Sequence, residues 1–217
     1  RLPHAQRVGL PVRDAIAELA EQGRSARRGP ARDSFGLRRD LPVLLVSGGS
    51  SGARSINRAT VAARDQLLAA GVQVLHVLGL KNFHDDKPVT DQQTGAGYHP
   101  VAYVDDMASA YAAADLMLAR SGAGTVVETA VVGLPAIMVP LPIGNGEQAR
   151  NAAPLVGADA GIIVPDDELG PQRLIREVVP LINDADRLST MGEAAQRVMP
   201  AGAAQRVANV VLQEASR

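Results

Sequence analysis

Residues 42–53 read PVLLVSGGSSGA, a short apolar run that passes directly into a cluster of glycine and serine. Apolar side chains then recur at steps of three and four residues as far as residue 68, which is typical of an amphipathic helix. The segment therefore predicts a strand, a tight turn and a helix in immediate succession.

The same unit recurs along the rest of the chain. Short apolar runs predict strands at 42–47, 72–78, 100–104, 116–119, 136–140 and 161–164. Helical patterns between and after them occupy 106–114, 125–132, 147–156, 171–182, 185–199 and 202–215. Alternating strands and helices indicate an α/β fold, here a Rossmann-like doubly wound parallel sheet of about six strands.

Composition excludes several classes of protein. The 217 residues carry 22 Lys and Arg against 23 Asp and Glu, without the basic excess expected of a general nucleic-acid binder. The absence of cysteine excludes a disulfide framework, a thiolate metal site and a cysteine nucleophile. No apolar run approaches the roughly 18 residues that a membrane-spanning helix needs.

The first 40 residues differ from the remainder and are interpreted as an interdomain segment that precedes a main domain at 41–217. A helix is predicted at about 14–22, and residues 24–39 then carry six arginines against one aspartate. We interpret this arginine-rich stretch as a solvated linker. The alternative is a basic patch that faces an anionic membrane surface or a nucleotide.

The glycine-rich turn at 48–53 is the first candidate ligand site. Glycines allow close approach of a ligand to the backbone, and a helix N-terminus offers unpaired N–H groups to a phosphate. The alternative is a plain tight turn with a serine N-cap. A dinucleotide site is disfavoured because the next strand ends in Gly79-Leu80-Lys81, without the required carboxylate. The Gly-Lys-Ser/Thr pattern of a nucleoside-triphosphate loop is also missing.

A second glycine-rich turn follows the strand at 116–119 and reads RSGAGTVVE at 120–128. It predicts another anion site on the same edge of the sheet. Glu128 is placed to accept hydrogen bonds from a ribose diol, or else to act only as a favourable charge near the helix start. Arg120 is expected to pair with Glu128 or Asp115.

The third candidate is the glycine- and proline-rich loop before the helix at 147–156. It delivers Glu147, Gln148 and Asn151 to the helix start, where they suit sugar hydroxyls or form an ordinary first turn. His76 lies within an apolar strand and is predicted to be a hydrogen-bonded core residue. We predict no metal site, because His84 and its acidic neighbours lack enough further ligands.

Four blocks of the sequence together resemble a known enzyme family. They are GLPVR, GGSSGA, AYVDDMASAYAAADLMLARSGAGTVVE and GLPAIMVPLPIGNGEQARNA. This family comprises the GT-B glycosyltransferases of peptidoglycan synthesis that transfer N-acetylglucosamine from UDP-GlcNAc to lipid I, giving lipid II. The resemblance extends from about residue 8 to 208 and is strongest to the actinobacterial branch.

The resemblance implies that this chain is the carboxy-terminal, donor-binding half of such an enzyme. The chain begins at Arg1 rather than at methionine, which agrees with a part of a longer protein. The acceptor site for lipid I, the membrane-association patch and the catalytic base then belong to the other half, so no catalytic residue is expected here. The family implies an inverting, cofactor-free enzyme that is peripheral on the inner face of the cytoplasmic membrane. The last helix is expected to pack back toward the other half.

The resemblance also assigns roles to individual positions. Arg13 and Ser50 are implied at the diphosphate, the Val104 backbone and Met107 at uracil, Glu128 at the ribose, and Gln148 at the GlcNAc hydroxyls. The turn that meets sugar and phosphates through backbone N–H groups comprises Ala123, Gly124, Thr125, Val126 and Val127. Gly49, Asn151 and Glu147 are further candidates, although many members have glutamine in place of Glu147.

Two other functions remain open from the sequence. One is another GT-B enzyme, such as a UDP-GlcNAc 2-epimerase or a glycolipid glycosyltransferase. The other is a non-catalytic nucleotide-binding or partner-docking domain.

Overall fold

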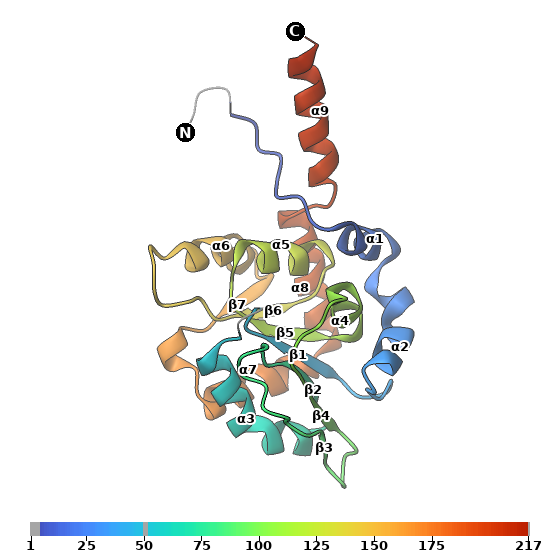
Figure 1. Ribbon diagram of the computed structural model, residues 1–217, viewed down its shortest axis with the longest axis vertical. Coiled ribbons are helices and arrows are strands. Elements are labelled where there is room, and N and C mark those ends of the chain that lie inside the picture. The colour runs from blue at the N-terminus through green and yellow to red at the C-terminus, as the bar shows by residue number, and fades with distance from the viewer. Residues whose placement is uncertain (1–4, 50–51, 217) are drawn as a thin grey trace.

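The computed structural model describes residues 5–49 and 52–216. Within those residues a single seven-stranded sheet has the order β3-β4-β2-β1-β5-β6-β7 (Figure 1). The strands are β1 (Val43–Ser47), β2 (Gln73–Val77), β3 (Val89–Thr90), β4 (Gly97–Val101), β5 (Leu116–Ala119), β6 (Ala136–Met138) and β7 (Gly161–Ile163). All neighbouring pairs are parallel except β3 with β4. The predicted α/β fold with a doubly wound sheet is confirmed.

The sequence prediction missed β3 and placed β4 three residues too late. β3 has only two residues, both exposed, and pairs antiparallel with the start of β4 at the edge of the sheet. A strand this short and exposed shows no alternation of apolar and polar side chains, so the sequence did not predict it.

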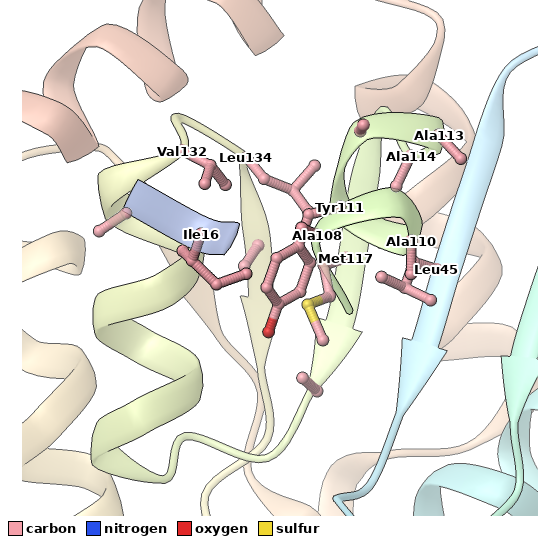
Figure 2. Packing of buried hydrophobic residues seen from close by; sticks show 14 of the residues in the cluster. Ile16, Leu45, Ala108, Ala110, Tyr111, Ala113, Ala114, Met117, Val132 and Leu134 are labelled. Carbon is pink, nitrogen blue, oxygen red and sulfur yellow. The ribbon is translucent and has the colours of Figure 1, made fainter. Parts of the chain in front are cut away.

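Helices cover both faces of the sheet. They are α1 (Asp14–Gln22), α2 (Arg24–Ser34), α3 (Arg54–Ala69), α4 (Met107–Ala113), α5 (Ala123–Val131), α6 (Glu147–Val156), α7 (Pro171–Ile182), α8 (Ala185–Val198) and α9 (Ala203–Ala215). Successive side chains of β1 alternate between the two cores: Leu44 and Val46 pack toward α3 and α7, whereas Val43 and Leu45 pack toward α1, α2 and α4. The second core surrounds the ring of Tyr111, which contacts a cluster that includes Ile16 and Met117 (Figure 2).

The interpretation of residues 24–39 as a solvated linker is wrong for most of the stretch. Residues 24–34 form α2, and Arg32 is only 2% exposed. Arg24 donates to the carbonyls of Tyr111, Ala114 and Gly133, and Arg32 donates to the carbonyl of Ala113. Three of these carbonyls lie at the end of α4, where they have no partner within that helix, and the Gly133 carbonyl follows α5.

Asp115 provides the counter-charge for α2. Its carboxylate accepts from Arg28, from Arg32 Nη2 at 2.6 Å and from the Val43 N–H at 2.7 Å. The carboxylate therefore joins α2 to the start of β1. Sequence reasoning missed this role because the partners are far apart in the chain.

The last helix projects away from the sheet (Figure 1). Ala203 is its one buried residue, and Val211 and Leu212 are more than 60% exposed. Arg206 Nε donates to the Val8 carbonyl at 3.0 Å and so ties the start of α9 to the amino-terminal segment. Among the described residues, no helix combines the length and the apolar character needed to cross a bilayer.

Candidate functional site

The candidate site lies where the order of the sheet reverses. β1 lies between β2 and β5, so the connections that follow β1 and β5 diverge and leave a crevice at the carboxyl ends of these two strands. The two predicted glycine-rich turns follow exactly these two strands. The structure therefore brings together segments that are about 70 residues apart in the sequence.

The first turn requires glycine for steric reasons. Gly52 has φ +72°, and a Cβ there would lie 2.1 Å from the Leu78 carbonyl oxygen. The turn leads into α3, whose N-cap is Ala53 with no side-chain capping bond. The N-cap position is therefore an alanine and not the serine of the alternative interpretation, and among the described residues no side chain caps the first N–H groups of α3. Ser50 lies outside the described residues, so the structure gives no account of its predicted contact.

A small cleft of about 140 Å³ lies beside this turn. We define the small cleft by its lining residues: Arg13, Ser47, Gly49, Val77, Tyr103, Val104, Met107, Tyr111, Met117, Thr125 and Glu128. Six predicted site residues therefore gather here from four separate segments of the chain. The apolar walls and a single carboxylate suit a flat heterocycle attached to a hydroxylated ring.

Glu128 forms the polar wall of the small cleft. Its Oε2 accepts from the Tyr111 hydroxyl at 2.8 Å, and its Oε1 lies 3.4 Å from Arg13 Nη2. The Glu128 side chain is 16% exposed, whereas that of Arg13 is 58% exposed. Burial, and then the neighbouring Glu128 charge, raise the pKa of Tyr111, so the phenol remains a hydrogen-bond donor.

A large cleft of about 930 Å³ continues from the small one. We define the large cleft by Gly48, Gly49, Gly52, Ala53, Arg54, Ser55, Arg58, Arg120, Gly122, Thr125, Leu141, Pro142, Gln148 and Asp166. Gly49 and Thr125 line both clefts, so the two form one continuous groove. A ligand longer than a nucleoside can extend from the small cleft into the large one.

The third predicted motif closes the far end of the large cleft. Gln148 Oε1 accepts from the Leu141 N–H at 2.9 Å and holds the loop that precedes α6. Asn151 Nδ2 donates to the Ser121 carbonyl at 3.1 Å and so connects α6 to the second glycine-rich turn. Glu147 is exposed. Of these three side chains, Gln148 is the one that lines the cleft.

The second glycine-rich turn leads into α5. Helix geometry leaves the N–H groups of Ala123, Gly124 and Thr125 at the start of α5 without intrahelical partners. The expectation fails for the next two residues. Val126 donates its N–H to the Gly122 carbonyl and is 1% exposed, and Val127 lines a different cavity beside Val8 and Met199.

Arg120 pairs with neither of its expected partners. Its guanidinium binds Asp166 at 2.6 Å and Ser55 Oγ at 2.9 Å, and it also donates to the carbonyls of Val139 and Pro140. Asp115 is occupied by α2, and Glu128 is occupied by Tyr111. Arg120 therefore ties the floor of the large cleft to α3 and to the segment around residue 166.

Sequence reasoning also missed Arg54, Arg58 and Tyr111. Arg54 directly follows the glycine-rich turn, and Arg58 lies one helical turn later, so their spacing is a signal that could have been used. Tyr111 lies among the apolar residues of a predicted helix, and this pattern suggests only an aromatic ring buried in the core. Within the described residues, no three His, Asp or Glu side chains gather where they could hold a metal ion.

Comparison with known families agrees with this geometry. The model of the glycosyltransferase family 28 C-terminal domain matches residues 43–207, which contain both glycine-rich turns and the large cleft. The chain belongs to this family. The predicted glycosyltransferase resemblance is thereby confirmed.

Individual relatives of this family 28 domain are close. The chain is 56% identical over 99% of its length to the UDP-N-acetylglucosamine–N-acetylmuramyl-(pentapeptide) pyrophosphoryl-undecaprenol N-acetylglucosamine transferase of Cutibacterium acnes. It is 50% identical over 98% of its length to the transferase of the same name from a Nocardioides species. It covers 58% and 57% of these two proteins, so the chain spans a little over half the length of the relatives it matches.

A solved structure is also similar. The crystal structure of Acinetobacter baumannii MurG matches 98% of this chain, with a TM-score of 0.75 and 26% identity, and the match covers 57% of that protein. A glycosyltransferase of kitacinnamycin matches 79% of the chain with a TM-score of 0.59 and 20% identity, a likeness of fold alone.

Proposed function

We propose that this chain is the UDP-GlcNAc-binding half of a glycosyltransferase that transfers N-acetylglucosamine to lipid I during peptidoglycan synthesis. One observation carries the proposal. At the reversal point of the sheet, two glycine-rich turns flank a continuous groove in which Glu128 lies at one end and Gln148 at the other. The names of the close relatives supply the sugar and the acceptor.

The small cleft is proposed to hold uridine. Val104 lines the small cleft, and within the described residues its backbone N–H and carbonyl form no hydrogen bond, so we assign both groups to the polar edge of uracil. Met107 packs beside that position. Glu128 accepts from the ribose hydroxyls, because its carboxylate is already oriented by Tyr111.

The diphosphate and sugar then extend into the large cleft. The free N–H groups and the positive dipole end of α5 face the place where charge develops on the departing UDP. Arg13 reaches the diphosphate from the rim, and Gln148 is positioned for the GlcNAc hydroxyls. Ser50 and Gly49 complete the phosphate side of the proposal.

The chemical step is proposed as a direct displacement. An acceptor hydroxyl oxygen bonds to the anomeric carbon, the bond from that carbon to the UDP oxygen breaks, and a base takes the acceptor proton. We assign the base and the lipid I site to the portion of the relatives that this chain does not span. The proposal includes a peripheral location on the cytoplasmic face of the membrane, and α9 docking onto that other portion.

The function is tested by calorimetric titration of UDP-GlcNAc and its 2′-deoxy analogue into wild type and Glu128→Gln. Glutamine keeps an acceptor for Tyr111 while removing the charge, so the fold is preserved. We expect about a tenfold loss of UDP-GlcNAc affinity, with little further loss for the deoxy analogue. Glu18→Ala, an exposed carboxylate on α1, is the control. Simple addition of the two losses would show that Glu128 does not contact the ribose.

Competition among UDP-GlcNAc, UDP-glucose and UDP-GalNAc tests the sugar. Preference for UDP-GlcNAc supports the proposal, whereas equal binding of all three favours a different GT-B enzyme. A 217-residue chain that binds no uridine nucleotide would contradict the proposal entirely.

A further inference from the structure

The large cleft contains more positive charge than its predicted ligands explain. Three arginines line it: Arg54 and Arg58 from α3, and Arg120 from the end of β5. None of the three was among the predicted ligand contacts. Their partners in the folded chain decide which of them is available to a ligand.

Arg120 is not available. Its guanidinium is neutralised by Asp166 at 2.6 Å and is further occupied by Ser55 and two backbone carbonyls. Its side chain is 13% exposed. A group held by this many partners serves the structure of the cleft, because a ligand would have to compete with a partly buried ion pair.

Arg54 and Arg58 are in the opposite situation. Both side chains are exposed, and within residues 5–49 and 52–216 neither forms a hydrogen bond or an ion pair. They lie four residues apart on α3, so both project from the same face of the helix into the cleft. Two guanidinium groups held near each other without a carboxylate repel one another, and a bound anion relieves that repulsion.

The position of these arginines indicates which anion. They stand beside the glycine-rich turn at the start of α3, on the side of the groove away from Glu128. Arg13, which the proposed function places at the diphosphate, lines only the small cleft and is partly engaged by Glu128, so it leaves the large-cleft side of the diphosphate to other cations. A uridine in the small cleft places its phosphates at the junction near Gly49, next to the α3 arginines.

We propose that Arg54 and Arg58 bind the diphosphate of the sugar nucleotide and so help to stabilise the departing UDP. This inference rests on the proposed function. Guanidinium groups suit the task because they donate two parallel hydrogen bonds to phosphate oxygens and remain charged at every accessible pH. The second phosphate, which carries the extra charge when UDP leaves, gains most from them.

The experiment compares UMP, UDP and UDP-GlcNAc by calorimetry in the 217-residue chain. Arg54→Gln and Arg58→Gln are each expected to lower UDP and UDP-GlcNAc affinity about tenfold, and to lower UMP affinity by much less. The double variant is expected to bind UDP little better than UMP. Arg176→Gln, which removes an exposed arginine from α7 away from both clefts, controls for net charge. Thermal unfolding checks that each variant remains folded.

Three outcomes would overturn the inference. The first is an equal loss for UMP and UDP, and the second is a loss no larger than that of Arg176→Gln. The third is unchanged UDP affinity in both arginine variants. That result would also be expected if the two arginines bound only the diphosphate of the acceptor. If wild type binds UDP-GlcNAc and Glu128→Gln weakens it while the arginine variants do not, the proposed function stands and this inference fails.

Discussion

The Tyr111 hydroxyl donates to Glu128 Oε2 at 2.8 Å, and the tyrosine ring is 2% exposed within the core between α1 and the sheet (Figure 2). A ligand-facing carboxylate is therefore oriented by a side chain that belongs to the core. Helix α5 sets the position of Glu128, and α4 sets its direction. Because of this coupling, a substitution at Glu128 is expected to change the free energy of unfolding.

Glu128→Ala is expected to lower the free energy of unfolding by about 1–3 kcal/mol, because it leaves the buried Tyr111 hydroxyl without a partner. A carboxylate acting only on the helix dipole would be worth about 0.3–1 kcal/mol. Urea denaturation of wild type and variant measures the difference. Adding Tyr111→Phe to Glu128→Ala is expected to recover part of the loss, since both polar partners are then absent. A double variant whose loss equals or exceeds the sum of the two single losses would contradict the coupling.

Gly52→Ala is expected to disrupt the first glycine-rich turn and to weaken UDP-GlcNAc binding at least tenfold. Gly71→Ala is the matched control, because Gly71 also has positive φ (+76°), has nothing within 4 Å of its added Cβ and lines neither cleft. Both variants incur the backbone strain of about 1 kcal/mol, whereas Gly52→Ala alone also meets the Leu78 carbonyl. Thermal unfolding and calorimetry of the pair measure the difference. Equal effects would show that the contact with the Leu78 carbonyl is unimportant.

Asp115→Ala is expected to destabilise the chain by about 3–5 kcal/mol, since it removes a largely buried carboxylate from two arginines and from a backbone N–H. Asp33→Ala breaks an exposed, solvent-screened ion pair with Arg39 and is expected to cost far less. Chemical denaturation of both variants tests the comparison. Similar small losses would mean that α2 is not held by Asp115.

Acidification is expected to destabilise the chain through His76. This residue is fully buried between Tyr98, whose hydroxyl is 2.9 Å from Nδ1, and Asn57, whose Oδ1 is 3.2 Å from Nε2. Because Asn57 Oδ1 only accepts, the neutral ring carries its proton on Nε2 and accepts from Tyr98. Burial lowers the pKa of His76 from 6.5 to about 4. The prediction of a hydrogen-bonded core histidine is confirmed.

The direction of the pH effect follows from this lowered pKa. The folded chain binds the His76 proton less readily than the unfolded chain, so the stabilisation is complete above pH 6.5 and is lost as the pH falls toward 4. The total loss is about 3 kcal/mol. Unfolding free energies of wild type and His76→Asn between pH 7 and pH 4 measure it. A wild-type slope no steeper than that of the variant would contradict the assignment.

Local patterns predicted those parts of the fold that have a clear period or a characteristic turn. The strands around Leu45 and Leu118 are continuous apolar runs covered on both faces, and α3 has a regular apolar stripe. Residues 24–34 could not be predicted in the same way. Helix α2 has low intrinsic helix tendency, with Gly29 and Pro30 within it, and is held by the α4 carbonyls and Asp115.

In the candidate site, the residue types could be predicted from the sequence, but their arrangement in space could not. The residue types at Gly52, Glu128 and Gln148 were recognisable because a tight turn and a helix start restrict which side chains can stand there. Their mutual arrangement was not recognisable in any one segment. The partners of Arg120 illustrate this, because Ser55 and Asp166 approach it from helices and loops 65 and 46 residues away.

Apart from β3 and α2, the sequence by itself determined the order of strands, turns and helices, because these depend on interactions among neighbours in the chain. Only the tertiary structure decided that Tyr111 orients Glu128, that Asp166 neutralises Arg120, and that Arg54 and Arg58 remain without partners among the described residues. Charge pairing depends on distance in space, and in this fold that distance is set by how the two crossovers diverge from β1 and β5.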